Sequence, residues 1–188
     1  HYGIKKLGYF CLEINMIEIA ITEKMKQRAW RKARSMGKLK NSITAGDGNI
    51  AGFLGEEIAN EIINGIVSNT YDYDILYETT SRKIKYDVKT KRCTSEPKPF
   101  YECSVAAYNT RQECDRYAFV RVEYKNGKWG RAWLLGWLEK EDYFRSAHKL
   151  RKGQTDPSNG FRVKANCYNV AISDLKKFRK KKGKINAN

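Results

Sequence analysis

Histidine is scarce in this sequence, since only His1 and His148 occur among its 188 residues. HNH, His-Me-finger and HD-type phosphodiesterase sites each need a catalytic or metal-binding histidine in a suitable context, so the sequence excludes these classes. A Ser-His-Asp triad is poorly supported for the same reason. We expect His148 to be a surface residue.

Cysteine is also sparse, odd in number and without any CxxC pair. The five cysteines are Cys11, Cys93, Cys103, Cys114 and Cys167. This pattern argues against a disulfide framework and against a zinc knuckle, and it predicts a reducing, cytoplasmic location. No run of 18 apolar residues occurs, so we expect no transmembrane helix and no membrane partner.

Positive charge is what the chain has in excess, with a formal net charge of +16 and a pI near 9.6. Such a field favours an anionic partner, and nucleic acid is the first candidate. An anionic membrane surface is the weaker alternative, because the basic residues do not form one long amphipathic helix with a bulky apolar face.

The length predicts one domain, which we place at residues 16–178. With 41% hydrophobic residues, the chain can bury a sizeable core. Residues 1–15 show no clear period and are set aside as a tag or an upstream extension. Residues 179–188 form a basic tail, which is typical of a solvated chain end.

The chain is organised around residues 71–92, which are typical of two strands joined by a short polar turn. A turn centred on residues 80 and 81 places Asp74 opposite Asp87, with both side chains on one face. Lys89 follows Asp87 by two residues and shares that face. Like charges facing each other destabilise a sheet, so the pattern favours a divalent cation between them, and Mg²⁺ prefers one or two such carboxylates.

Asp74, a spacer of 12 residues and then Asp87-Val88-Lys89 resemble the signature of the PD-(D/E)XK nuclease superfamily. That superfamily includes many restriction endonucleases, archaeal-type Holliday junction resolvases and RecB-like nucleases; Tyr73 replaces the proline of its name. The resemblance implies that Asp74 and Asp87 ligate Mg²⁺, for which Mn²⁺ substitutes, and that the Val88 carbonyl is a further ligand. Lys89 is then the group that positions or deprotonates the attacking water, or stabilises charge on the phosphate.

The segment from Ile50 to Val67 is predicted as the clearest helix, with one apolar stripe along it. Glu56 lies at the border of that stripe, and Glu57 projects nearly opposite it. The order Gly-x-x-Gly-Glu that ends at Glu56 also resembles the first helix of many PD-(D/E)XK enzymes, where this glutamate helps to hold the metal directly or through water. We assign that role to Glu56, with Glu57 as the alternative; the plain interpretation is that both are solvent-facing carboxylates.

A basic helix is predicted to begin at the N-cap Thr22 and to run to Gly37. Its plain interpretation is a packing helix with a solvated basic face. The functional interpretation adds phosphate contacts from Arg31 and Lys32. Lys91 and Arg92, which follow the candidate lysine on the second strand, are the other nucleic-acid-binding candidates.

The resemblance implies an α/β fold with a restriction-endonuclease-like core, in which a central mixed sheet of four to five strands is flanked by helices. After the hairpin we expect a strand at 100–106, a short helix at 108–114, strands at 117–124 and 129–137, a helix at 139–150, a strand at 161–172 and a short helix at 173–178. The strand at 117–124 is nearly continuous in apolar residues, which predicts burial on both faces.

RecB-like members carry a Gln-x-x-x-Tyr motif on the helix after the third strand. In this chain Gln112 and Tyr117 are one residue too far apart for that motif. We therefore expect Gln112 and Asn109 to be ordinary surface residues; the alternative is that both face the site from a helix beside it.

The leading functional prediction is a metal-dependent deoxyribonuclease that binds and hydrolyses DNA, with an endonuclease as the expected form. Cutting of both strands would suggest a homodimer. One alternative is a non-catalytic, basic nucleic-acid-binding protein on the same fold, in which the hairpin carries only a solvated Asp–Lys pair. Another is a protein-interaction module whose basic surface meets an acidic protein.

Overall fold

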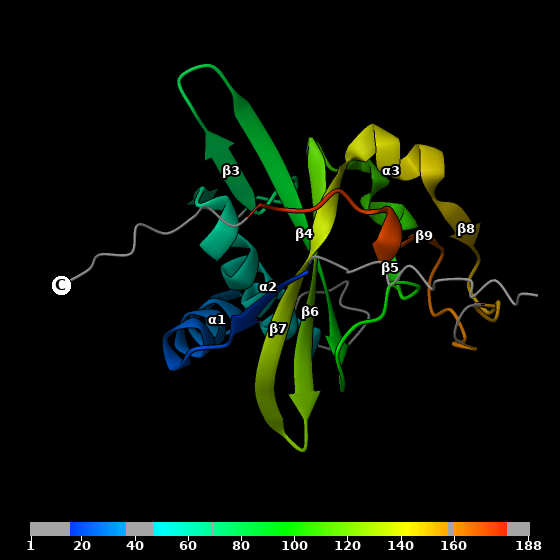
Figure 1. Ribbon diagram of the computed structural model, residues 1–188, viewed down its shortest axis with the longest axis horizontal. Helices are drawn as coiled ribbons and strands as arrows, with labels where there is room; N and C mark the ends of the chain where they lie inside the picture. Colours follow the sequence, from blue (N-terminus) through cyan, green and yellow to red (C-terminus); the bar gives the residue numbers. More distant parts are fainter. Residues whose placement is uncertain (1–15, 37–46, 69, 158–159, 180–188) are drawn as a thin grey trace, which may run out of the picture.

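Two β-sheets form the frame of the computed structural model, which describes residues 16–36, 47–68, 70–157 and 160–179 (Figure 1). The larger sheet has six strands in the order β1-β7-β6-β4-β3-β2, and the second has the order β5-β9-β8. In chain order the elements are β1 (Ile17–Ala20), α1 (Glu23–Met36), α2 (Asp47–Ile63), β2 (Ile66–Val67), β3 (Ile75–Glu78), β4 (Lys83–Cys93), β5 (Glu102–Ala106), the 3₁₀ helix η1 (Ala107–Arg111), β6 (Arg116–Lys125), β7 (Lys128–Glu139), α3 (Lys140–Ser146), β8 (His148–Leu150), β9 (Cys167–Ala171) and the 3₁₀ helix η2 (Ile172–Asp174). The predicted α/β class is confirmed.

The β3–β4 hairpin has the register that the sequence predicts. Its turn is closed by a hydrogen bond from the Thr79 amide to the Arg82 carbonyl (2.8 Å), and Ile75 pairs with Tyr86. The Asp74 amide continues the ladder by donating to the Tyr86 carbonyl (2.9 Å). On its other edge β4 runs parallel to β6, so the sheet is mixed, as expected.

Helices α1 and α2 cover one face of the larger sheet (Figure 1). The Thr22 hydroxyl accepts a hydrogen bond from the Met25 amide (3.2 Å), which confirms the predicted N-cap of α1. On α2, Gly55 lies directly on β4, because a Cβ atom there would come 1.8 Å from Thr90 Oγ1. Only a residue without a side chain allows this close approach, and it brings the adjacent Glu56 up to the sheet.

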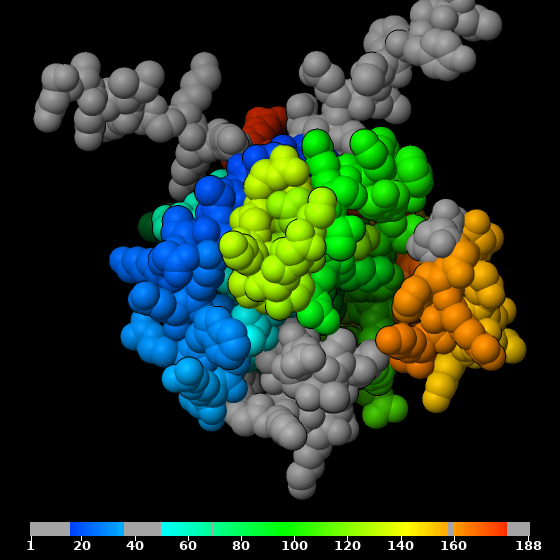
Figure 2. Space-filling view, turned by 90° about the horizontal axis from the view of Figure 1, so that it is seen from below, coloured from blue at the N-terminus to red at the C-terminus, as the bar shows by residue number. Residues whose placement is uncertain are grey.

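The opposite face of the larger sheet is covered by the second sheet and α3. Strand β6 alternates between two cores: Ala118 and Val120 belong to the cluster beneath the helices, whereas Tyr117 and Phe119 belong to the cluster beneath the second sheet. Burial of β6 on both faces is therefore confirmed. Figure 2 shows the β6–β7 hairpin lying between α1 and the segment around residues 150–165.

Several predicted details of the sheet were wrong. The larger sheet has six strands rather than four or five, and β1 was not predicted. The strand expected at 100–106 forms as β5, but it pairs with β9 in the second sheet. The helix expected at 108–114 is the shorter 3₁₀ helix η1. The partner of β5 is remote in sequence, and no local pattern reveals such a partner.

Helix ends were also misplaced, for identifiable reasons. Helix α2 stops at Ile63 rather than at residue 67, because Asn64 adopts a positive φ of 55° and the Gly65 amide turns to the Asn60 side chain (2.9 Å). The helix expected at 139–150 ends at Ser146, and the following residues join β9 as β8.

At the C-terminal end, the predicted helix at 173–178 is replaced by η2 and an extended segment. That segment forms a bridge between Lys176 and Trp137. The predicted extension at 1–15 and residues 180–188 of the basic tail lie outside the described residues, as do residues 37–46 between α1 and α2.

Among the helices of the described ranges, none combines the length and the apolar character needed to cross a bilayer. The four cysteines in these ranges, Cys93, Cys103, Cys114 and Cys167, carry free thiols.

Candidate active site

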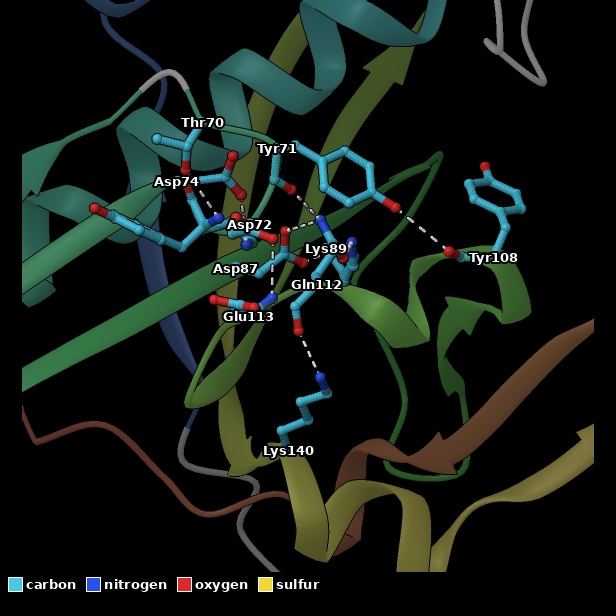
Figure 3. Close-up of polar contacts among 12 residues, drawn as sticks. Thr70, Tyr71, Asp72, Asp74, Asp87, Lys89, Tyr108, Gln112, Glu113 and Lys140 are labelled. Carbon is cyan, nitrogen blue, oxygen red and sulfur yellow. Dashed lines mark hydrogen bonds and ion pairs between the residues drawn. The ribbon is translucent and has the colours of Figure 1, made fainter.

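The two predicted aspartates lie side by side where β3 meets β4 (Figure 3). Asp74 immediately precedes β3, and its Oδ2 accepts a hydrogen bond from the Val88 amide (2.7 Å). Asp87 lies on β4 and is only 3% exposed. The hydrogen bond from the Val88 amide holds the Asp74 carboxylate against β4, so the two acidic side chains lie together in a buried site.

Lys89 and Gln112 complete the polar contacts of Asp87. The Lys89 ammonium lies 2.6 Å from Asp87 Oδ2 and donates to Gln112 Oε1 (3.1 Å). Gln112 Nε2 in turn donates to Asp87 Oδ1 (2.9 Å) and to the Tyr71 carbonyl (2.7 Å). One amide side chain therefore holds both the acid and the lysine in place (Figure 3).

The favoured expectation that Gln112 is a surface residue was wrong, because it is 6% exposed and donates a hydrogen bond to Asp87, as the alternative expectation required. Asn109, by contrast, is half-buried and contributes to the wall of a neighbouring cavity. The spacing between Gln112 and Tyr117 misled the prediction. Gln112 is the residue that ends the 3₁₀ helix η1, so no helical register relates it to Tyr117 on β6.

The negative charge of the site is incompletely neutralised. Burial, followed by the charges of Asp87 and Glu56, raises the pKa of Asp74 well above its ordinary value. Asp87 Oδ2 lies at ion-pair distance from the Lys89 ammonium. Within the described part of the chain, however, it makes no hydrogen bond of good geometry. The Lys89 ammonium thus faces two buried aspartates.

Glu56 approaches the aspartates from α2. It is 9% exposed and forms an ion pair with Lys32. Burial raises its pKa even though the ion pair with Lys32 lowers it, and the charge of Asp87 adds to the rise. Glu57 turns instead to Arg28, whose Nε donates to it (2.6 Å).

Glu56 is therefore the glutamate that acts electrostatically on the aspartates. The plain interpretation of both glutamates as solvent-facing was wrong for Glu56.

The four predicted nucleic-acid-binding cations lie in different surroundings. Lys32 is occupied by Glu56, and its ammonium lies 4.8 Å from the centre of the Phe53 ring, whereas Arg31 is exposed on α1. Arg92 lies over the Tyr124 ring (5.7 Å) and is also exposed. Lys91 donates to the Ser104 hydroxyl (2.6 Å) across the gap between the two sheets.

Two exposed aromatic rings flank the site, and neither was predicted from the sequence. Tyr71 and Tyr108 are 64% and 52% exposed, and the Tyr71 hydroxyl donates to the Tyr108 carbonyl (3.4 Å). Figure 3 shows both rings on the Gln112 side of the aspartates. Exposed aromatic rings beside such a site are suited to stacking unpaired bases.

The donor set can be tested against the ion that the resemblance implies. Across residues 16–36, 47–68, 70–157 and 160–179, no three His, Cys, Asp or Glu side chains gather into a group able to hold a metal. The pair Asp74 and Asp87 nevertheless matches Mg²⁺ in kind, because this ion takes one or two carboxylates and keeps several waters. A bound cation would give Asp87 Oδ2 a further partner and would lower the raised pKa of Asp74.

No model of a known protein family matches this chain, and no curated protein matches it. Its chemistry therefore has to be inferred from the side chains themselves.

Proposed function

We propose that this protein is a Mg²⁺-dependent deoxyribonuclease of the PD-(D/E)XK type, acting as an endonuclease. The observation that carries the proposal is the meeting of Asp74, which directly precedes β3, with Asp87 of β4, and the contact of Lys89 with Asp87. A buried pair of like charges beside one ammonium costs stability, which points to a role in binding a cation and an anionic substrate.

Asp74 and Asp87 would hold the ion, with the Val88 carbonyl as a further ligand and Glu56 acting directly or through water. When bound, Mg²⁺ supplies Lewis acidity toward the phosphate and makes a water molecule a stronger acid. Mn²⁺ would support the same chemistry. Glu56 contributes negative charge from α2, which Gly55 brings onto β4.

Lys89 carries the chemistry that the chain itself provides. Its ammonium is held between Asp87 and Gln112, so it has a fixed place beside the acids. From there it orients the attacking water by hydrogen bonding and stabilises the charge that develops on the phosphate oxygens. Gln112 is a positioning residue, because it is itself buried and holds both Lys89 and Asp87.

The order of elements supports the finer fold assignment. Helix α2 is followed by the β3–β4 hairpin, and β4 then pairs in parallel with β6. That order resembles the α/β core of the superfamily, with the candidate residues on the expected elements. The departure is β5, which belongs to the second sheet.

DNA is the proposed substrate because the net charge of +16 favours a polyanion. Branched or single-stranded DNA is favoured over a long duplex site. Tyr71 and Tyr108 support this preference, since their exposed rings beside the site can stack on bases that are not paired.

A substrate panel tests the proposal directly. Labelled linear duplex, nicked, branched and single-stranded DNA, together with RNA, are incubated with Mg²⁺, Mn²⁺ or EDTA. The wild type should cut DNA with either metal and not with EDTA. Asp87→Asn should lower cleavage by about a thousandfold. Glu102→Gln, which changes a buried carboxyl on the second sheet, is the matched control and should retain cleavage.

Binding of nucleic acid without cleavage under every metal condition would refute the enzyme and favour the non-catalytic binding protein. Absence of binding at low salt would refute both. An unchanged rate in Asp87→Asn would show that any observed cleavage comes from elsewhere.

A further inference from the structure

A small cavity adjoins the candidate site on the Lys89 side. Its volume is about 170 Å³, and it lies between β4 of the larger sheet and β5 of the second sheet. Its walls include Lys89 and Lys91 from β4, Ser104 from β5 and Arg121 from β6. Lys89 is shared with the candidate site, so a ligand in the cavity would continue into that site.

Two cations converge in this cavity on one backbone carbonyl oxygen. Arg121 Nη2 donates to the Glu102 carbonyl (2.8 Å), and the Lys91 ammonium lies 3.4 Å from the same oxygen while donating to Ser104 (2.6 Å). Neither cation has an ion pair with an acidic side chain in the described ranges. A single neutral carbonyl does not neutralise two full charges.

Mutual repulsion of the two cations is visible in the electrostatics. Burial and then the charge of Arg121 lower the pKa of Lys91. Lys91 as a residue is exposed, yet its ammonium turns inward to Ser104 and Glu102. Such a cluster of positive charges without an ion pair is suited to an anion that accepts hydrogen bonds from lysine, arginine and hydroxyl groups together.

We propose that the pocket formed by Lys91, Arg121 and Ser104 binds a phosphate group of the substrate strand, next to the phosphate that is cut. This inference rests on the proposed nuclease function. Lys89 and Lys91 are two residues apart on one strand, so their Cα atoms are about 6.6 Å apart on the same face. That separation is of the order of one nucleotide step along an extended strand. The pocket thus fixes the register of the strand relative to Lys89.

The first experiment uses small probes and no cleavage. Binding of inorganic phosphate, a nucleoside monophosphate and a dinucleotide is measured by thermal shift and calorimetry in EDTA, at constant ionic strength with chloride as reference. The wild type should bind, and Lys91→Met and Arg121→Met should each bind about tenfold more weakly. Lys128→Met removes an equal charge from the exposed start of β7 and should bind as the wild type does.

The probes also separate the sources of the phosphate. Preference for the monophosphate indicates a strand end, and preference for the dinucleotide indicates an internal linkage. Methylphosphonate interference then tests the register. A neutral linkage in the DNA should slow wild-type cleavage at the one phosphodiester bond that lies at a fixed offset from it. Lys91→Met should cut that bond at the same rate as the neighbouring bonds. If Arg121→Met fails to fold, Lys91→Met carries the test.

Equal binding of the probes by wild type, Lys91→Met and Lys128→Met would overturn the pocket, as would no binding by the wild type. Cleavage that persists in that case leaves the nuclease proposal intact. Conversely, phosphate binding that depends on Lys91 without cleavage by any metal supports the pocket and refutes the nuclease.

Discussion

Two groups of buried carboxylates can be compared, one at the candidate site and one on the second sheet. At the site, Asp74 and Asp87 face each other across adjacent strands. On the second sheet, Glu102 of β5 is bonded by Asn169 Nδ2 (2.7 Å) and lies 3.1 Å from His148 Nε2. Burial, and then a hydrogen bond with Asp156, raises the pKa of Glu102.

The difference lies in how each group is satisfied. Both oxygens of Glu102 have partners on the neighbouring strands of its own sheet, so its carboxyl joins β5, β8 and β9. Asp87 is contacted instead by Lys89 of its own strand (2.6 Å) and by Gln112 from the end of η1 (2.9 Å), and Asp74 lies beside it. Burial and a raised pKa occur in both groups, so neither property alone marks a functional site. The candidate site differs in gathering a third carboxylate, Glu56, whose charge acts on Asp74, and in placing the Lys89 ammonium against Asp87.

The sharpest way to break the comparison is to remove the ammonium of the site. Lys89→Met should lower cleavage by about a thousandfold, because it removes the group that stabilises charge on the phosphate. Affinity for DNA in EDTA should change much less, since most cations remain. Cleavage kinetics and fluorescence anisotropy measure the two effects. Lys83→Met, on the exposed end of the same strand, is the control and should cut normally; equal losses in both variants would contradict a specific role for Lys89.

A smaller effect is expected at the glutamates of α2, and it separates Glu56 from Glu57. Glu56→Gln should lower cleavage by about a hundredfold by weakening metal binding, as outer ligands commonly do. Glu57→Gln should change the rate less than twofold, because Glu57 pairs with Arg28. Titration of activity with Mg²⁺ measures the shift, and the reverse ranking would move the role to Glu57.

Gln112 sharpens the comparison through positioning. Gln112→Leu preserves approximate size and removes the bonds to Asp87 and Lys89, so kcat should fall about tenfold. KM for DNA should stay nearly constant, because Gln112 is not expected to touch substrate. The exposed neighbour variant Glu113→Ala serves as the control. A rise in KM with constant kcat would instead indicate a substrate contact.

The smallest effect concerns stability and pH. Because the folded-state pKa of Asp74 is raised, its contribution to stability is present below the unfolded value, about 3.9, and is lost as pH rises through the folded value. Asp74→Asn should therefore increase the free energy of unfolding at pH 7 by about 1 kcal/mol. The gain should shrink as the pH falls toward 4.

Denaturant unfolding across pH measures this difference. Mg²⁺ should stabilise the wild type and not the variant, because only the wild type retains both carboxylates. A variant that is less stable at pH 7, with a deficit that shrinks on acidification, would show that the Asp74 charge stabilises the fold.

Local sequence signals identified the hairpin and its acids well. Period-two alternation and a central polar turn set the register that places Asp74 beside Asp87, and that register is found. The cap at Thr22 and the two-sided burial of β6 were likewise predicted. Each of these features depends on residues that are neighbours in the chain.

Three other contacts were not predictable in this way: Gln112 with Asp87, Arg121 with the Glu102 carbonyl, and the Glu102 carboxyl with Asn169. Each depends on β5 pairing with β9 or on η1 folding back onto β4, and these contacts join residues far apart in sequence.

The sequence by itself determined the positive charge, the hairpin register and the placing of two aspartates and a lysine on one strand face, because strand alternation and turn position are local properties. The tertiary structure alone decided which glutamate reaches those acids, which amide holds the lysine and where uncompensated cations gather. These outcomes depend on which elements pack together, and the free energy of that packing is shared by side chains that no short segment contains.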